Sequence, residues 1–313
     1  MAGWTAEDIP DQSGRTAVVT GANSGLGLVT SRELARANAT VVMACRDPGR
    51  GEQARAEVMA VAPGAEVALE RLDLAALASV REFAAKVARD RGRIDILVNN
   101  AGVMGPPRGE TADGFELQLG TNHLGHFALT GLLLDALLAA PAGRVATVTS
   151  PMHRVGRIDF DDLQRERGYN RWLAYGQSKL ANLLFARELQ ARLAKAGAGT
   201  LSVAAHPGYA ATHLQSTGPG AGGGLMARVW TGVLAIGNRV YAQSEEIGAL
   251  PQLYAATAPE VPGGALVGPS SFDQMRGHPK LVGSSRAGSD MEVARRLFDV
   301  SAELTGVDYA ALS

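Results

Sequence analysis

Two side chains with the spacing for proton transfer, Tyr175 and Lys179, lie near the middle of the chain. They belong to the run 172–195, whose apolar residues recur at helical spacing, so both project from one face of a predicted helix. A free phenol has a pKa of about 10, and a cation held nearby lowers that pKa by favouring the phenolate. The pair therefore predicts a proton-transfer site. The alternative is a half-buried ring beside a solvated charge.

A third polar side chain, Ser150, stands two residues after the end of the apolar run 145–148. Its hydroxyl is expected at the carboxyl end of a strand, which is the edge where open α/β sheets bind ligands. At that edge it can donate a hydrogen bond to a substrate oxygen on which negative charge develops. Serine also ends strands through turn hydrogen bonds, and this alternative stays open.

A phosphate-binding turn is predicted near the N-terminus. The β-rich run 17–19 is followed by the glycine-rich segment 20–27 and then by a helical pattern. Glycine lets the backbone approach a phosphate without an intervening Cβ, and the free N–H groups at a helix start favour an anion. A simple tight turn is the alternative. The residues predicted to hold the phosphates are Gly21, Asn23, Ser24, Gly25, Leu26 and Gly27.

The elements that must position these groups alternate regularly along the chain. Helical patterns separate the β-rich runs 40–45, 67–72, 94–98, 144–149 and 201–205. This alternation predicts βαβ units, and therefore a Rossmann-type, doubly wound parallel α/β sheet with helices on both faces. Because no linker or internal repeat interrupts the chain, we expect one domain over 1–313 with an N-terminal extension at 1–14.

Charge and cysteine content narrow the class of protein. With 30 basic against 31 acidic side chains, nothing favours a nucleic acid partner. Cys45 is the only cysteine, which excludes an intrachain disulfide and fits a reducing compartment. Residues 1–15 contain no apolar run, and the apolar stretch 225–236 is interrupted by Arg228 and too short to span a bilayer. We therefore expect a cytoplasmic protein without a membrane anchor.

Taken in order, the motifs resemble those of the short-chain dehydrogenases/reductases over about 15–212. Within that family, the segment from Ser150 to Asn182 is most similar to the branch of retinol dehydrogenases and protochlorophyllide reductases. The resemblance implies an oxidoreductase that moves a hydride between a nicotinamide dinucleotide and a carbonyl or alcohol. The landmarks that carry it are Thr20-Gly21-x-x-x-Gly25-x-Gly27, Asp73-Leu74, Asn99-Asn100-Ala101-Gly102, Asn122, Ser150, Tyr175-x-x-x-Lys179 and His206-Pro207-Gly208.

The resemblance assigns roles to four catalytic residues. Tyr175 is the general acid for carbonyl reduction or the base for alcohol oxidation, and Lys179 binds the nicotinamide ribose and lowers the tyrosine pKa. Ser150 donates to the substrate oxygen. Asn122 holds a water that links Lys179 to solvent. Since Asn122 lies inside a predicted helix, a satisfied buried amide is the alternative for that residue.

The end of the second predicted strand decides between the two nicotinamide cofactors. An acidic side chain there binds the ribose 2′-hydroxyl, whereas an arginine accommodates a 2′-phosphate. Cys45 stands where the acid would be and Arg46 follows it, so the sequence predicts NADP(H) in preference to NAD(H). The alternative is that Arg46 is a solvated charge next to Asp47.

Further cofactor contacts are implied by the resemblance alone. Asp73 also has the alternative of capping the helix that follows it. The implied contacts are Asp73 and Leu74 at the adenine, Asn100, Ala101 and Gly102 at the adenosine ribose, Tyr175 and Lys179 at the nicotinamide ribose, and Pro207, Gly208 and Thr212 at the nicotinamide.

A substrate lid is predicted over 213–238, where the glycine-rich segment 218–224 leads into the apolar stretch 225–236. In the lid arrangement an apolar pocket favours a lipophilic carbonyl or alcohol; the alternative is a helix packed on the sheet. The residues that would line the pocket are Leu214, Leu225, Met226, Val229 and Trp230.

Three further expectations concern partners. The polar insertion 154–171 is expected beside the catalytic helix. In many members of the family that helix packs in a dimer or tetramer interface, so the insertion would cover the interface and leave a monomer; a homodimer is the alternative. His153 and His206 have no partner at metal-ligand spacing, so they are expected to be structural or close to substrate, with no metal bound. The competing functional class is a non-catalytic NAD(P)-binding sensor.

Overall fold

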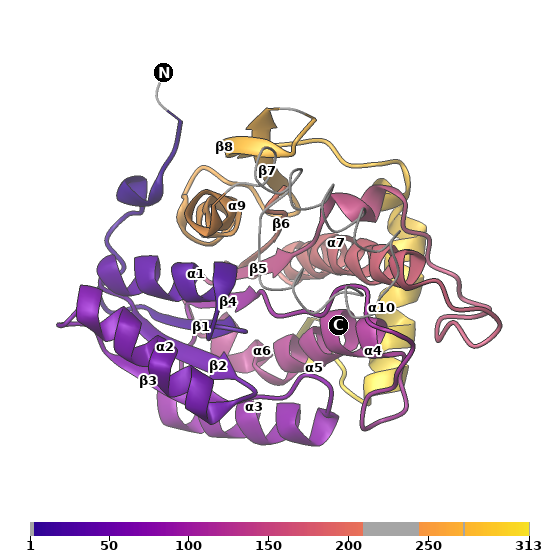
Figure 1. Ribbon diagram of the computed structural model, residues 1–313, viewed down its shortest axis with the longest axis horizontal. Coiled ribbons are helices and arrows are strands. Elements are labelled where there is room, and N and C mark those ends of the chain that lie inside the picture. The colour runs from indigo at the N-terminus through magenta and orange to yellow at the C-terminus, as the bar shows by residue number, and fades with distance from the viewer. Residues whose placement is uncertain (1–2, 209–243, 272, 313) are drawn as a thin grey trace, which may run out of the picture.

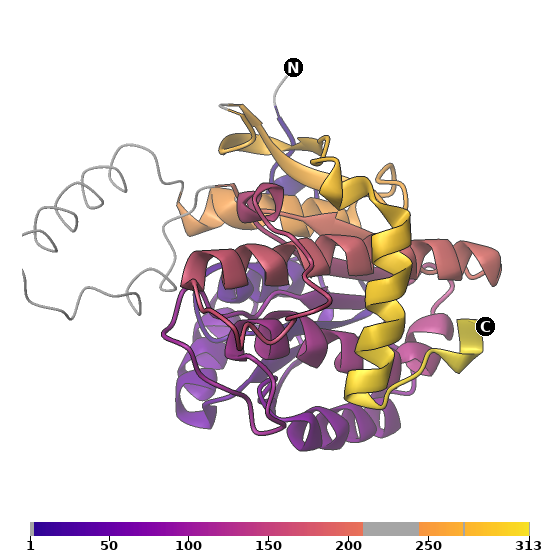
Figure 2. The same cartoon turned by 90° about the vertical axis from the view of Figure 1, so that its right-hand side faces the viewer.

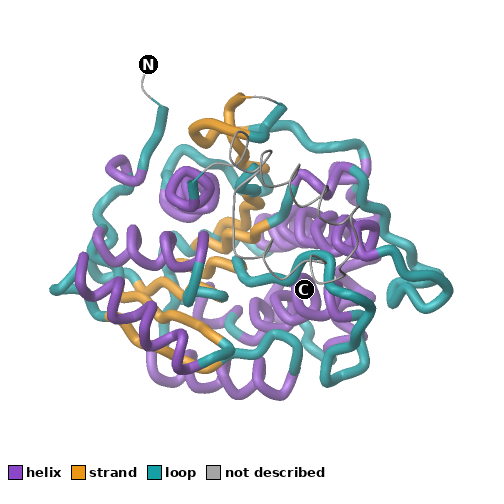
Figure 3. Tube along the Cα trace, in the orientation of Figure 1, coloured by secondary structure: helices purple, strands orange, loops and turns teal. Residues whose placement is uncertain are grey.

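One sheet runs through the part of the chain that the computed structural model describes, residues 3–208, 244–271 and 273–312. Its strand order is β3-β2-β1-β4-β5-β6-β7-β8, and the strands lie between two layers of helices (Figures 1 and 3). The strands are β1 (Thr16–Thr20), β2 (Thr40–Cys45), β3 (Val67–Arg71), β4 (Ile96–Asn99), β5 (Arg144–Val148), β6 (Leu201–Ala205), β7 (Leu266–Ser271) and β8 (Arg276–Leu281).

Successive side chains of the central strands point into two separate cores, one on each face of the sheet. In β1, Ala17 and Val19 face one core and Val18 faces the other. Helices α1, α2 and α9 cover the first face, and α3, α5 and α7 cover the second (Figure 1). These helices are α1 (Gly25–Arg36), α2 (Pro48–Val61), α3 (Leu77–Arg91), α5 (Gly125–Leu132), α7 (Arg171–Lys195) and α9 (Glu245–Thr257). The predicted doubly wound α/β fold is confirmed.

The order of the strands reverses at β1, because β2 follows on one side of it and β4 lies on the other. Both pairings are parallel, so the carboxyl ends of β1 and β4 open at the same edge. Ligands of open α/β sheets bind in the crevice at such a reversal. This edge is therefore where the candidate site is expected.

The last two strands differ from the sequence expectation of a wholly parallel sheet. β7 joins β6 in parallel, but β8 pairs with β7 in antiparallel register and forms one border of the sheet. Each of the two strands contains a proline, and Pro269 stands opposite Pro279. Proline cannot donate to a ladder and is confined to border strands and irregular positions, which is why neither run resembled a strand in the sequence.

Helix α10 (Met291–Thr305) crosses α7 on the outside of the second helical layer (Figure 2). Its Phe298 meets Phe127 of α5 with ring centroids 4.9 Å apart, and Tyr309 lies 4.7 Å from Phe298. The Tyr309 hydroxyl donates to the main-chain oxygen of Phe127 at 2.8 Å. This aromatic cluster joins the C-terminal segment to the helices that carry the candidate catalytic side chains.

Short elements complete the described part of the chain. The described part of the N-terminal extension, residues 3–14, packs through Trp4, whose ring lies 5.1 Å from that of Tyr254 in α9. The remaining elements are α4 (Leu117–Leu119), α6 (Leu134–Leu138), the π-helical turn η2 (Gly120–Leu124), and the 3-10 turns η1 (Ala6–Asp8), η3 (Pro151–Arg154), η5 (Ala287–Ser289) and η6 (Ala310–Leu312).

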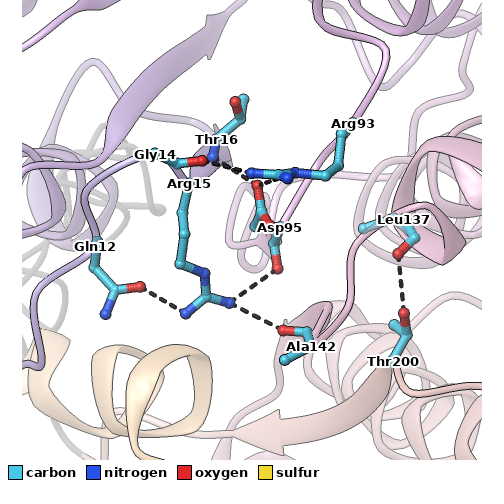
Figure 4. Close-up of polar contacts among 9 residues, drawn as sticks. All are labelled: Gln12, Gly14, Arg15, Thr16, Arg93, Asp95, Leu137, Ala142 and Thr200. Atoms are coloured by element: carbon cyan, nitrogen blue, oxygen red, sulfur yellow. Dashed lines mark hydrogen bonds and ion pairs between the residues drawn. The ribbon is translucent and has the colours of Figure 1, made fainter.

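A closed polar network holds the amino-terminal edge of the sheet (Figure 4). The buried carboxylate of Asp95 accepts from the main-chain N–H of Thr16 at 2.9 Å and from Arg93 at 3.2 Å. Arg15 donates to the carbonyl of Ala142 at 3.0 Å and to Gln12 at 2.8 Å. These bonds fix the start of β1 against the loops that precede β4 and β5.

Candidate active site

Tyr175 and Lys179 lie on one face of α7, as their spacing predicts. Asn170 caps this helix by accepting from the N–H groups of Trp172 at 3.0 Å and Leu173 at 3.2 Å. Tyr175 is 6% exposed and Lys179 is 4% exposed, so the alternative of a solvated lysine does not hold. The Lys179 Nζ lies 5.8 Å from the centre of the Tyr175 ring and donates to the carbonyl of Val148 at 3.2 Å.

Burial dominates the electrostatics of this pair. It raises the pKa of Tyr175 to about 12, although the hydrogen bond with Ser150 lowers it in part. It also lowers the pKa of Lys179 from 10.5 to about 8. The net shift of the phenol pKa is thus opposite to the expected lowering, because desolvation outweighs the hydrogen bond.

Ser150 is the second residue after β5. Its side chain has both of the roles that the sequence suggested, a contact at the candidate site and a turn hydrogen bond at the end of the strand. Its hydroxyl hydrogen-bonds to Tyr175. The same oxygen accepts from the N–H of Met152 at 3.3 Å and so caps η3. The carbonyl of Ser150 accepts from both the main-chain N–H and the Nδ1 of His153, at 2.9 and 2.7 Å. The serine is therefore held on both sides while its hydroxyl faces the tyrosine.

Asn122 sits in the π-helical turn η2, a departure from the continuous helix that the sequence predicts. Such turns occur at functional sites, because one extra residue redirects the side chains and loosens the backbone bonding. The Asn122 amide donates to the carbonyl of Val103 at 3.0 Å and to Ser178 at 2.9 Å, and it accepts from the Val103 N–H at 2.7 Å. Both amide hydrogens are used within the protein.

Gly102 lies between Asn122 and Lys179. A Cβ at this glycine would stand 3.0 Å from the Asn122 Oδ1 and 3.5 Å from the Lys179 Nζ. The backbone of the loop after β4 therefore reaches the catalytic candidates directly. This contact joins the loop that carries Asn100 and Ala101 to α7.

The glycine turn fits a pyrophosphate group. Gly21 has a φ of +65°, and a Cβ at Gly27 would stand 2.3 Å from the carbonyl of Gly21, so neither position accommodates a larger side chain. Ser24 makes no side-chain cap to α1, so the first N–H groups of that helix stay available for an anion. Asn23, Gly25 and Leu26 complete the turn.

Arg46 is exposed directly after β2, at the position predicted for a 2′-phosphate contact. Its neighbour Asp47 is the N-cap of α2 and accepts from the N–H of Arg50 at 3.1 Å. The Asp47 carboxylate is thus engaged in the helix cap. The neighbouring acid is therefore occupied at the start of α2 and does not argue against a phosphate contact by Arg46.

Asp73 and Leu74 follow β3 at the same edge of the sheet. Asp73 accepts from the N–H of Ala75 at 3.0 Å, which makes a local turn before α3, while the N-cap of that helix is Ala76. Leu74 is buried against Gly125 of α5. The predicted alternative of a capping aspartate therefore does not describe this residue.

Asn100 and Ala101 are held by the last residue of β1. The N–H groups of both donate to the Thr20 hydroxyl oxygen, at 2.9 and 3.0 Å. The Asn100 side chain donates to the carbonyl of Thr20 at 2.8 Å and accepts from Gln252 of α9 at 3.1 Å. Three elements thus meet at this loop.

Pro207 and Gly208 follow β6, where the sequence predicts the nicotinamide. His206 is buried; its Nδ1 accepts from the Gly208 N–H at 3.2 Å, and its Nε2 lies 3.1 Å from the side-chain oxygen of Gln274. His153 is buried as well, and the two imidazole centres are 6.1 Å apart. Within the described part of the chain, no cluster of three or more His, Cys, Asp or Glu side chains could hold a metal.

Some predicted site features lie outside the described residues. They are Thr212, the lid at 213–238 and the pocket residues Leu214, Leu225, Met226, Val229 and Trp230.

Sequence reasoning passed over three residues that the fold brings to this edge. Trp172 is 45% exposed, and its ring lies 3.3 Å from where a Cβ at Gly105 would stand. Gln252 reaches Asn100 from α9, and His126 reaches Thr20 from α5. The only sequence signal was spacing: Trp172 stands three residues before Tyr175, and His126 stands four residues after Asn122.

The short-chain dehydrogenase family model matches residues 15–219. The chain belongs to this family. It is 43% identical to human retinol dehydrogenase 13 over 94% of the chain and 86% of the relative, and 40% identical to mouse retinol dehydrogenase 11 over 94% and 87%. As a short-chain dehydrogenase, it is a hydride-transfer oxidoreductase of the NAD(P)-binding class that acts on a small molecule.

Solved structures agree with this assignment. The crystal structure of an uncharacterised protein from Mycobacterium paratuberculosis has a TM-score of 0.81 and 45% identity, covering 98% of this chain and 99% of that one. A second structure, described as an NAD(P)-dependent gluconate 5-dehydrogenase from Beutenbergia cavernae with bound NADP, has a TM-score of 0.61 and 28% identity, covering 81% and 94%.

The expected cytoplasmic location is wrong. Retinol dehydrogenases 11 to 14, to which this short-chain dehydrogenase is similar, are membrane-associated enzymes. Across the described residues, no helix is long and apolar enough to cross a bilayer. The lack of an apolar run in residues 1–15 and the single cysteine did not indicate the location, because association with a membrane surface requires neither a long apolar helix nor a disulfide.

Proposed function

We propose that this short-chain dehydrogenase transfers a hydride between NADP(H) and a lipophilic carbonyl or alcohol, with Tyr175 as the general acid or base. The observation that carries the proposal is the meeting of three side chains at one edge of the sheet. Ser150 hydrogen-bonds to Tyr175, and Lys179 lies 5.8 Å from the ring of that tyrosine. Ser150 follows β5, and Tyr175 and Lys179 lie in α7.

In carbonyl reduction, Tyr175 gives its hydroxyl proton to the substrate oxygen as the carbonyl carbon is reduced. The bound nicotinamide supplies the hydride. Ser150 donates a hydrogen bond to the same oxygen, where negative charge develops. The ammonium of Lys179 favours the phenolate that remains, because no carboxylate among the described residues forms an ion pair with it. In alcohol oxidation the phenolate accepts the proton.

Asn122 supports this pair from η2. Both hydrogens of its amide are bound to Val103 and Ser178. A water that links Lys179 to solvent can therefore contact this side chain only through the remaining lone pair of Oδ1. In this proposal the amide mainly fixes the distance between η2 and α7, and the water is secondary.

The preference for NADP(H) rests on Arg46, with Asp47 engaged in the cap of α2. An exposed guanidinium can bind a 2′-phosphate without first breaking an internal ion pair. We expect higher catalytic efficiency with NADPH than with NADH, and Arg46→Ala should reduce that ratio by about tenfold. Equal efficiency with the two cofactors in the unaltered protein would contradict the assignment. Arg50→Ala, on the neighbouring turn, is the matched control.

A lipophilic substrate is supported by the apolar side chains next to the candidate acid. Trp172 and Leu173 are 45% and 49% exposed, although both begin the helix that carries Tyr175. Large apolar side chains left open beside a reactive group are typical of a binding surface for an apolar ligand. Trp172→Ala should raise KM for a long-chain aldehyde more than for a short one. Equal changes for both aldehydes would contradict an apolar contact.

A monomer is supported by how the insertion 154–171 is held. Tyr169 bonds to Gln118 at 2.9 Å, and Gln164 accepts from the N–H of Glu116 at 2.7 Å. Gln177 of α7 donates to the carbonyl of Leu163 at 2.9 Å. The insertion thus packs on its own chain and covers part of α7. A stable tetramer in light scattering would contradict this proposal.

The decisive experiment combines calorimetry of NADPH binding with a screen of NADPH consumption over carbonyl compounds. Tyr175→Phe should reduce turnover by at least ~100-fold while NADPH affinity stays within about twofold of the parent value. Tyr169→Phe is the matched control, because it also removes a tyrosine hydroxyl, six residues before Tyr175, and should retain turnover. Turnover by Tyr175→Phe at the parent rate would overturn the assignment. Binding without turnover over a wide panel would favour the non-catalytic sensor.

A further inference from the structure

A buried histidine, His126, bridges the two halves of the candidate site. It lies one helical turn after Asn122 and is 1% exposed. Its Nδ1 is 2.9 Å from the main-chain oxygen of Asn122, and its Nε2 is 2.9 Å from the Thr20 hydroxyl. Thr20 is the last residue of β1 and directly precedes Gly21. One imidazole ring therefore connects η2 to the glycine turn.

The partners of this ring fix where its proton lies. A carbonyl oxygen only accepts hydrogen bonds, so Nδ1 carries the proton and Nε2 is the acceptor. The hydroxyl of Thr20 must then donate to His126, which leaves its lone pairs for the N–H groups of Asn100 and Ala101 at 2.9 and 3.0 Å. The other acceptor for that hydroxyl, the carbonyl of Val98, is farther away at 3.3 Å. Each donor in this series of hydrogen bonds has one acceptor.

Burial keeps the ring in the neutral form that this network needs. Burial, opposed in part by the bond to Asn122 and assisted by the positive charge of Lys179, lowers the pKa of His126 to about 4. The ring therefore stays neutral at any pH near 7. Its contribution is geometric.

We propose that His126 is a positioning residue that couples the cofactor loop at Asn100 and Ala101 to Asn122, one of the four candidate catalytic residues. The inference rests on the proposed function and adds a residue to that site. A threonine hydroxyl rotates freely unless an acceptor fixes it. With its proton held by His126, Thr20 presents both lone pairs to the loop, and the same ring holds the carbonyl of Asn122 in place. Removal of the imidazole releases both ends together.

Calorimetry of NADPH binding tests the coupling. His126→Phe keeps a ring of similar shape but removes both polar contacts, and it should weaken NADPH binding by about tenfold, since the Asn122 carbonyl loses the Nδ1–H donor and the Thr20 hydroxyl is left with only the more distant Val98 carbonyl as its acceptor. Thr20→Val should have a similar effect, whereas Thr20→Ser, which keeps the hydroxyl, should stay within about twofold of the parent affinity. In the double variant the two losses should not multiply, because both substitutions break one network. Losses that multiply fully would overturn the coupling.

Two further measurements keep the inference testable if His126→Phe does not fold. Thr20→Val and Thr20→Ser alone still give the expected contrast, and equal affinities for these two variants would overturn the proposal. Nitrogen-15 spectra of histidine-labelled protein should show His126 with the proton on Nδ1, and a proton on Nε2 would overturn it.

Ser301→Ala is the matched control for loss of a buried hydrogen bond, because Ser301 bonds to the neighbouring His123 at 2.9 Å and lies in α10. This variant should lose stability without a change in NADPH affinity, and a tenfold weaker affinity would overturn the inference. If the parent protein binds no dinucleotide at all, the proposed function fails. The tautomer of His126 still tests the network in that case.

Discussion

The amino-terminal and carboxyl-terminal edges of the sheet each bury a charged side chain, but the partners of the two charges differ. At the amino-terminal edge, the Asp95 carboxylate is paired with Arg93 and bonded to the N–H of Thr16, as Figure 4 shows. At the carboxyl-terminal edge, Lys179 is as deeply buried, and among the described residues its ammonium donates only to the carbonyl of Val148, at 3.2 Å. Arg93 compensates the first charge, whereas no carboxylate in the described part of the chain forms an ion pair with the second.

The difference separates residues that hold the fold from residues that serve a reaction. A buried ion pair with its hydrogen bonds complete resists change and offers nothing to a ligand. A buried cation without a counter-charge destabilises the folded protein and gains its partner only when an anion or a polar ligand arrives. Substitutions at the two edges should therefore move stability and activity in different directions.

The largest effect is expected for Lys179→Met, which keeps the length of the side chain and removes its charge. Turnover should fall by ~100-fold or more, because the phenolate of Tyr175 loses its cation. The free energy of unfolding at pH 7 should rise by about 2 kcal/mol, since a buried uncompensated charge is removed. Urea denaturation and an NADPH-consumption assay measure the two quantities. A variant that is both inactive and less stable would break the comparison.

Asp95→Asn should have the opposite effect. The substitution keeps the shape but leaves Arg93 without its counter-charge, and it should lower the free energy of unfolding by about 2 kcal/mol. Arg93 is 45% exposed, so solvent reduces the loss. Turnover per folded molecule should stay within about twofold, because this edge takes no part in the reaction. A large fall in turnover at unchanged stability would contradict the assignment of this edge to structure.

The pH dependence of stability sharpens the comparison further. Burial lowers the pKa of Lys179 to about 8, whereas the unfolded chain keeps a value of about 10.4. Between these values the unfolded chain binds more protons, so the free energy of unfolding rises with pH from about 8 to about 10. Burial raises the pKa of Tyr175 to about 12, which opposes this rise only above about pH 10.

Lys179→Met should lack this rise. Its advantage in stability over the parent protein should therefore shrink by about 1 to 2 kcal/mol between about pH 7 and about pH 9.5. Parallel urea titrations at the two pH values measure the difference, and other titrating groups cancel because both proteins carry them. A constant difference would mean that Lys179 titrates at the ordinary lysine pKa.

The smallest effect concerns Glu245 at the start of α9. Its carboxylate oxygen lies 3.4 Å from where a Cβ at Gly25 would stand, so a negative charge lies beside the N-terminus of α1. Glu245→Gln should tighten NADPH binding by about threefold, because it removes a charge that repels the phosphates. Glu246→Gln is the matched control, since it alters the same helix start on an exposed side. Equal changes for both variants would assign the effect to α9 alone.

Much of the fold could be predicted from local pattern. Residues 40–45 and 201–205 were predicted as strands with the bounds that β2 and β6 have, and the helix predicted over 172–195 differs from α7 by one residue. Short β-branched runs between amphipathic helices leave few alternatives to a parallel sheet. β7 and β8 escaped prediction because Pro269 and Pro279 interrupt the strand pattern, and they become strands only through the pairing of β7 with β6 and of β8 with β7.

By itself, the sequence determined the order of the elements and the motifs at their ends, because periodicity and spacing act along the chain. It could not determine the π-helical turn around Asn122, the bridge from His126 to Thr20, or the balance that raises the Tyr175 pKa. These features depend on which groups surround each atom once water is excluded. Only the tertiary structure decides that, since desolvation and hydrogen bonding join residues more than a hundred positions apart.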